Sequence, residues 1–150
     1  MKRLQPNLIA IFVAGLLVTT FLFVEPARAV LPNPVLAFVG QQSFIKEGKA
    51  FVRYRFDVFN RASFPSALFE AAPALPPCGS NTNSSRTWVD IFDQRGKRLY
   101  GFCAFSKAND LGSIWFALEE GVLPPSYVYI EMNDRQTNTK YKSNLADTTR

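Results

Sequence analysis

Few residues of this chain belong to the types that carry out chemistry. It contains no histidine, which excludes a Ser-His-Asp or Cys-His arrangement and acid–base catalysis by an imidazole. The close carboxylate pairs are Asp90 with Asp93 and Glu119 with Glu120. Adjacent residues on a strand point to opposite faces, so Glu119 and Glu120 make a poor acid–base couple. We therefore predict no catalytic residues, and a carboxylate-dependent hydrolase is the least favoured alternative.

The sequence also indicates neither a metal site nor a cofactor site. A zinc site would have to use the two cysteines and carboxylates. We expect the two cysteines to form a disulfide bond with each other instead. Asp90, Asp93 and the pair Asn133-Asp134 lie at expected turns, where such side chains satisfy backbone amides. Two carboxylates are too few to hold Ca²⁺. No glycine-rich phosphate loop is present.

The two cysteines, Cys78 and Cys103, lie 25 positions apart, the first in a proline-rich segment and the second on an expected strand. They are not in a Cys-x-x-Cys motif, which disfavours a redox role. Their bond would close a loop of about 26 residues, for which chain entropy gives a stabilisation of about 3 to 4 kcal/mol. We predict a structural disulfide.

The first residues have the pattern of a secretory signal peptide. Met1-Lys2-Arg3 is basic, Leu8 to Val24 is apolar and uncharged, and Ala27-Arg28-Ala29 is a small-x-small cleavage site. We therefore expect a signal peptide over residues 1–29 and a secreted or periplasmic product with no membrane span after cleavage. The alternative is retention as an anchor, because the apolar stretch is close to the minimum length of a membrane span.

The remainder of the chain is of a size for one domain, predicted over residues 30–144 and followed by a flexible C-terminal tail at 145–150. Without the predicted leader, the net charge falls from +5 to +3. The charges are interspersed and form no basic run, so we do not expect a nucleic-acid partner. The sequence predicts no particular oligomeric state.

The apolar pattern beyond Val35 has a period of two, which is typical of strands. In the segment Ala50 to Asn60, one face is apolar and the other is polar. Thr87 to Asp93 and Lys97 to Phe105 form a predicted hairpin, with Asp93-Gln94-Arg95-Gly96 as its turn. The apolar face of 50–60 comprises Val52, Tyr54, Phe56 and Val58, and the exposed face Arg53, Arg55 and Asp57.

Further strands are predicted over Val35–Val39, Ser113–Leu118, Ser126–Met132 and Lys140–Ser143, with a short edge strand at Ala67–Phe69. About seven strands in one small domain predict an all-β fold, an antiparallel two-sheet sandwich of immunoglobulin or fibronectin-like layout. The immunoglobulin arrangement of two strand cysteines flanking a tryptophan is not met, because Pro76-Pro77-Cys78-Gly79 is unsuited to a central strand.

Four short stretches resemble small exported bacterial proteins of unassigned function. They are Pro77-Cys78-Gly79, Ser85 to Asp90, Leu99 to Cys103 and Asp134-Arg135. The resemblance implies export and brings no activity with it.

The candidate binding residues are Arg86, Trp88, Tyr127 and Tyr129. Residues 61–86 form a long irregular segment, tethered by Cys78 and ending at Arg86, and long loops of this kind often bind a partner. Tyr127 and Tyr129 should point away from the core if Val128 and Ile130 point into it.

The leading hypothesis from these residues is a non-enzymatic exported β-sandwich that binds a protein or a cell-envelope surface through this loop and the adjacent hairpin. The alternative is a carbohydrate-binding module, with an envelope polysaccharide as partner, that uses exposed rings as stacking platforms. Solvent exposure of the rings separates the two hypotheses. The platforms would be Trp88, Trp115, Tyr127 and Tyr129.

Overall fold

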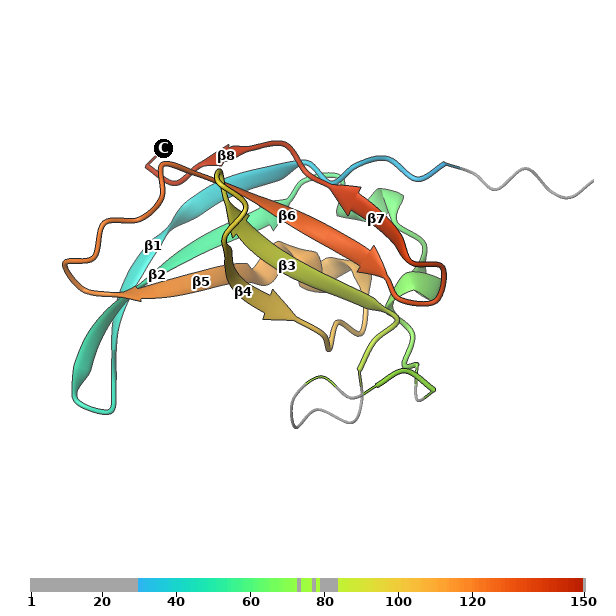
Figure 1. Cartoon of the computed structure of the whole chain (residues 1–150), viewed down its shortest axis with the longest axis horizontal. Coiled ribbons are helices and arrows are strands. Elements are labelled where there is room, and N and C mark those ends of the chain that lie inside the picture. Colours follow the sequence, from blue (N-terminus) through green and yellow to red (C-terminus); the bar gives the residue numbers. More distant parts are fainter. Residues whose placement is uncertain (1–29, 73, 77, 79–83, 150) are drawn as a thin grey trace, which may run out of the picture.

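The computed structural model describes residues 30–72, 74–76, 78 and 84–149, and the signal peptide predicted for residues 1–29 lies outside this range. The described chain folds into two antiparallel sheets packed face to face (Figure 1). The all-β sandwich predicted from the sequence is therefore confirmed.

The described strands form one sheet of three strands and one sheet of five strands. The first sheet has the order β1-β2-β5, and the second has the order β4-β3-β6-β7, with a short β8 paired to β6. The strands are β1 (Leu36–Lys46), β2 (Lys49–Val58), β3 (Thr87–Asp93), β4 (Arg98–Phe102), β5 (Ile114–Glu119), β6 (Tyr127–Asp134), β7 (Thr139–Lys142) and β8 (Ala146–Asp147).

The core lies between the inner faces of the sheets, and β2 shows why the chain folds this way. Tyr54, Phe56 and Val58 are buried, at 6%, 1% and 0% exposure, while Arg55 between them is exposed. The predicted register is thus confirmed for these residues. Arg53 was expected to be exposed, but it is half-buried, because its guanidinium lies against the rings of Phe44 and Trp115. The opposing sheet contributes Val89, Ile91, Val128, Ile130 and Met132.

The β3–β4 hairpin forms at the predicted turn. The Asp93 carboxylate accepts hydrogen bonds from the backbone N–H groups of Arg95 and Lys97, at 2.8 and 2.9 Å. Gly96 has φ +83°, a conformation that favours glycine. The second strand of the hairpin ends at Phe102, three residues before the predicted end at Phe105.

The segment between β2 and β3 contains two short 3₁₀ helices, η1 (Arg61–Ser63) and η2 (Ser66–Phe69). The predicted edge strand at Ala67–Phe69 is therefore wrong. The adjacent residues Leu68 and Phe69 are both buried, and a strand would point them to opposite faces. A third 3₁₀ helix, η3 (Ala108–Ser113), was not foreseen and leads into β5.

The disulfide between Cys78 and Cys103 is confirmed, with the two Cα atoms 6.1 Å apart. It ties the long segment to the residues that follow β4, where the Ser85 N–H also donates to the Cys103 carbonyl oxygen at 2.8 Å.

The chain end differs from the predicted flexible tail at residues 145–150. Ala146 pairs with Val128 and Asp147 with Tyr127, which makes β8 part of the second sheet. The Thr148 N–H donates to the Ser126 carbonyl oxygen, and Thr148 is buried. The sandwich therefore extends beyond residue 144, through Thr149 in the described chain.

Candidate binding surface

Two of the predicted binding residues, Trp88 and Tyr129, lie on the outer face of the second sheet, where other side chains cover their rings. The Arg135 guanidinium sits 4.0 Å from the centre of the Trp88 ring. Tyr129 stacks on Phe92, with ring centres 5.3 Å apart, and the Lys142 ammonium lies 4.1 Å from the Tyr129 ring centre. These contacts are cation–π and aromatic pairs that stabilise a sheet surface.

Trp115 is covered in the same way. Tyr100 stacks against it at 5.0 Å, and the Arg53 guanidinium lies 4.5 Å from the indole centre. A sugar-stacking platform needs a free ring face, so neither tryptophan is arranged for one. Of the four rings proposed as platforms, Tyr127 is the one that is strongly exposed.

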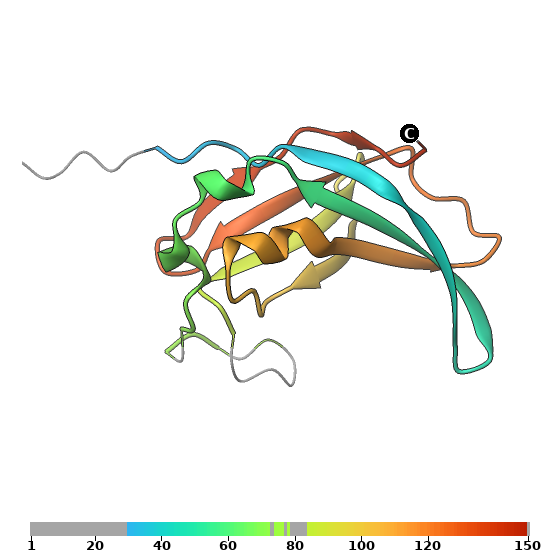
Figure 2. The ribbon, with the colours of Figure 1, turned by 180° about the vertical axis from the view of Figure 1, so that it is seen from behind.

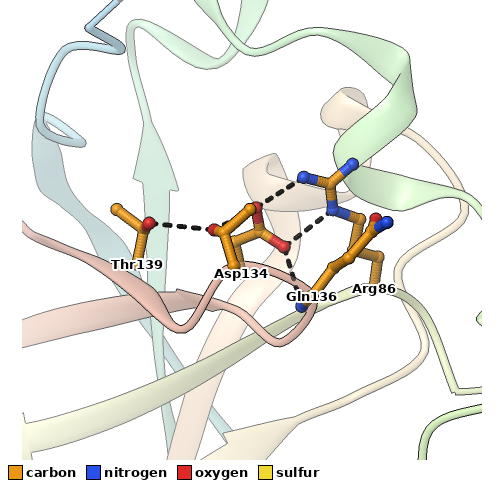
Figure 3. Close-up of polar contacts among 5 residues, drawn as sticks. Arg86, Asp134, Gln136 and Thr139 are labelled. Carbon is orange, nitrogen blue, oxygen red and sulfur yellow. Dashed lines mark hydrogen bonds and ion pairs between the residues drawn. The ribbon is translucent and has the colours of Figure 1, made fainter. Parts of the chain in front are cut away.

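Arg86, the fourth predicted residue, is held by Asp134. Its guanidinium donates two hydrogen bonds to the carboxylate, from Nε at 2.7 Å and from the second nitrogen at 2.6 Å. The Gln136 N–H and the Thr137 hydroxyl also donate to Asp134, and the Thr137 and Thr139 hydroxyl oxygens lie within hydrogen-bond distance of each other, at 2.8 Å (Figure 3). The cluster fastens the end of the long segment to the β6–β7 turn.

Electrostatics explain why Asp134 stays charged although its side chain is almost fully buried. Burial opposes ionisation and would raise the pKa of the carboxyl, but the hydrogen bonds from Arg86, Thr137 and the Gln136 N–H outweigh it. They hold the pKa of Asp134 at about 2, against an ordinary value of 3.8. The hydrogen bonding between Arg86 and the Asp134 carboxylate also raises the pKa of the Arg86 guanidinium. With both charges paired, the cluster is built to join two segments.

A different surface lies at the end of the sandwich that carries the β1–β2 hairpin. Both views show this hairpin extending beyond the second sheet (Figures 1 and 2). Along the inner face of β2, exposure rises toward the hairpin: Tyr54 is buried, Val52 is half-buried and Ala50 is exposed. The core-facing side of the first sheet thus continues into solvent. We call this region the uncovered end.

Two elements carry exposed apolar side chains at the uncovered end. Ile45 pairs with Ala50 across the hairpin and is 78% exposed. The Ala50 carbonyl accepts a hydrogen bond from the Glu120 N–H, which brings the β5–β6 loop alongside. In that loop Val122 is 51% and Leu123 is 89% exposed.

Behind the loop, an open hollow of about 360 Å³ separates it from the β3–β4 turn. Its apolar lining includes Leu99, Leu118 and Pro124, and its polar lining includes Arg95 and Lys97. The end is rimmed by charges of both signs. Lys49 pairs with Glu119 at 3.3 Å and Lys46 with Glu47 at 4.0 Å, and both pairs are exposed.

The sequence did not single out this surface. The alternating pattern from Val52 to Val58 identified the inner face, but only the tertiary arrangement shows where the second sheet stops covering it. The available signal was the apolar run Val122-Leu123-Pro124-Pro125, which directly follows the turn Glu119-Glu120-Gly121. Prolines keep such a run out of a central strand, so it had to lie in a loop.

Within the described ranges, no three His, Cys, Asp or Glu side chains come together in a way that could hold a metal ion. Three of the carboxylates considered for catalysis have partners: Asp90 accepts from Arg98 at 2.6 Å, Asp93 caps its turn, and Glu119 pairs with Lys49. No helix in the described residues is long and apolar enough to span a membrane. Comparisons with protein families, with curated proteins and with solved structures find no match to this chain.

Proposed function

We propose that this chain is a non-enzymatic, exported binding module that docks onto a partner protein through the uncovered end. One observation carries the proposal: the apolar inner face of the first sheet runs past the second sheet, and Ile45 on the hairpin and Val122 and Leu123 in the β5–β6 loop are exposed at that end. An apolar sheet face left exposed on a folded domain is typical of an interaction site.

The rim favours a protein over an envelope polysaccharide or an anionic lipid surface. Protein interfaces combine an apolar centre with a polar rim that carries both charge signs. Here Lys46, Lys49, Arg95 and Lys97 are balanced by Glu47, Glu119, Glu120 and Asp93. A polyanion would be attracted by an excess of basic over acidic residues. The residues named for this rim include equal numbers of the two.

Export is supported by the leader pattern of residues 1–29 and by the disulfide, which persists in oxidising compartments. The covered faces of Trp88 and Trp115 argue against a carbohydrate-stacking module. The resemblance to small exported bacterial proteins fits the same proposal without adding an activity.

Site-specific photo-crosslinking in the producing cell tests the docking surface. A photoreactive amino acid at Leu123 should yield an adduct with a second protein. The matched control is Phe59, an equally apolar side chain that is 68% exposed at the other end of β2. Adducts at position 123 that are absent at position 59 support the proposal. Equal adducts at both positions, or adducts at position 59 alone, would overturn it.

A further inference from the structure

The edge of the first sheet formed by β1 lacks the protection that the other sheet edges have. β1 is eleven residues long and pairs only with β2 among the described strands. From Leu36 to Ile45 it carries no charge and no proline. An edge strand that is long, uncharged and free of proline is a ready template for pairing with another strand.

The other edges are shorter and are blocked. β7 has four residues, two of which are Lys140 and Lys142. β4 has five residues and begins at Arg98. The remaining edge of the first sheet, β5, lies under the aromatic contact between Trp115 and Tyr100 of β4. Charged or covered edges of this kind prevent pairing between molecules.

At the first residue of β1, a side chain forms hydrogen bonds with the backbone N–H and carbonyl groups. The Asn144 side chain accepts a hydrogen bond from the Leu36 N–H at 2.8 Å and donates to the Leu36 carbonyl oxygen at 3.0 Å. Among the described residues, no side chain forms such hydrogen bonds with the backbone of residues 41–46 of β1. The register shift between Phe38 and Gly40 separates the covered start of the strand from this regular open stretch.

We propose that β1 pairs antiparallel with β1 of a second copy of this chain, with residues 41–43 of one copy against 43–41 of the other and residues 44–46 reaching positions 40–38 at the register shift. A two-fold axis through Gln42 places each Gln42 against its counterpart and each Ser43 against Gln41 of the other copy, so like faces meet. The single charge of the stretch, Lys46, then lies far from its own counterpart. A self-complementary strand without like-charge contacts favours a second copy as the occupant, and an isologous interface of this kind closes at a dimer. The two sheets would join into one of six strands.

This inference is independent of the proposed partner docking, because pairing uses the backbone edge of β1, whereas docking uses the inner face and the β5–β6 loop. It can be measured on the purified exported protein without any partner. Sedimentation equilibrium should show a dimer for the unmodified protein.

A charge-swap pair at Gln42 supplies the decisive test. Q42K and Q42E should each weaken the dimer by up to about fivefold, because like charges then face each other across the axis. An equimolar mixture of the two should recover the dimer, which a misfolded variant would not do. Leu123→Lys is the matched control, and it should leave the dimer unchanged. A monomeric unmodified protein, a Q42K dimer of undiminished strength, or a mixture that stays monomeric would each overturn the inference.

Discussion

Replacing Asp134 by asparagine should destabilise the domain in a way that depends on pH. The carboxylate is nearly buried and accepts two hydrogen bonds from Arg86, and its pKa of about 2 lies below the ordinary 3.8. A shift of this size corresponds to about 2 kcal/mol of differential stabilisation of the ionised form. The variant should lose about that much stability at neutral pH, and more if Arg86 is left without a full partner.

The pH window follows from the sign of the shift. Because the folded-state pKa is lowered, the unfolded chain takes up a proton first as the pH falls. The contribution of Asp134 is therefore fully present above about pH 4 and disappears as the pH approaches about 2. The difference in unfolding free energy between the parent protein and Asp134→Asn should shrink over this window.

Urea unfolding followed by tryptophan fluorescence, at pH 7 and at several values down to pH 2, measures this difference. Glu119→Gln is the matched control, since its ion pair with Lys49 is exposed and should be worth less than about 1 kcal/mol. If Asp134→Asn costs no more than Glu119→Gln at pH 7, or if its cost is the same at pH 7 and pH 2, the account of the cluster is refuted.

Three further predictions concern the sandwich itself. Phe56→Ala should cost about 3 to 5 kcal/mol through the cavity it leaves, and Arg55→Ala should cost little; equal shifts in denaturant midpoint would contradict the assigned faces. Arg53→Ala should cost about 1 to 2 kcal/mol more than Arg55→Ala, because Arg53 lies between two rings, and a double-mutant cycle with Trp115→Ala should show coupling. Replacing Cys103, together with Cys78, by serine should lower the unfolding free energy by about 3 to 4 kcal/mol in the same assay, and no change would show that the bond does not constrain the unfolded chain.

Local pattern was sufficient to predict much of the fold. Alternation in β2 and the Asp93-to-Gly96 turn identified strands and a hairpin, because both depend on residues close in sequence. The disulfide was predictable because only two cysteines are present. The 3₁₀ helix at Ser66–Phe69 was missed because its two adjacent buried residues acquire their role only when the long segment folds over the core.

The site was less predictable, since it depends on contacts between distant segments. Arg86 and Trp88 were selected as candidate binding residues, but Asp134 and Arg135, almost fifty positions further on, engage them. Arg53 was expected to face water for the same reason: its aromatic neighbours come from β1 and β5. The uncovered end depends on the relative extent of two sheets, which no local pattern encodes.

The affinity of the crosslinked partner for three forms of the protein tests the central proposal most directly. Leu123→Lys places a charge in the uncovered end, Phe59→Lys makes the same change on the far side, and the parent protein is the reference. We expect Leu123→Lys to weaken binding about tenfold or more, as loss of a central apolar contact does, and Phe59→Lys to bind like the parent. Undiminished binding by Leu123→Lys, or a greater loss with Phe59→Lys, would contradict the proposal that this domain docks through its uncovered end.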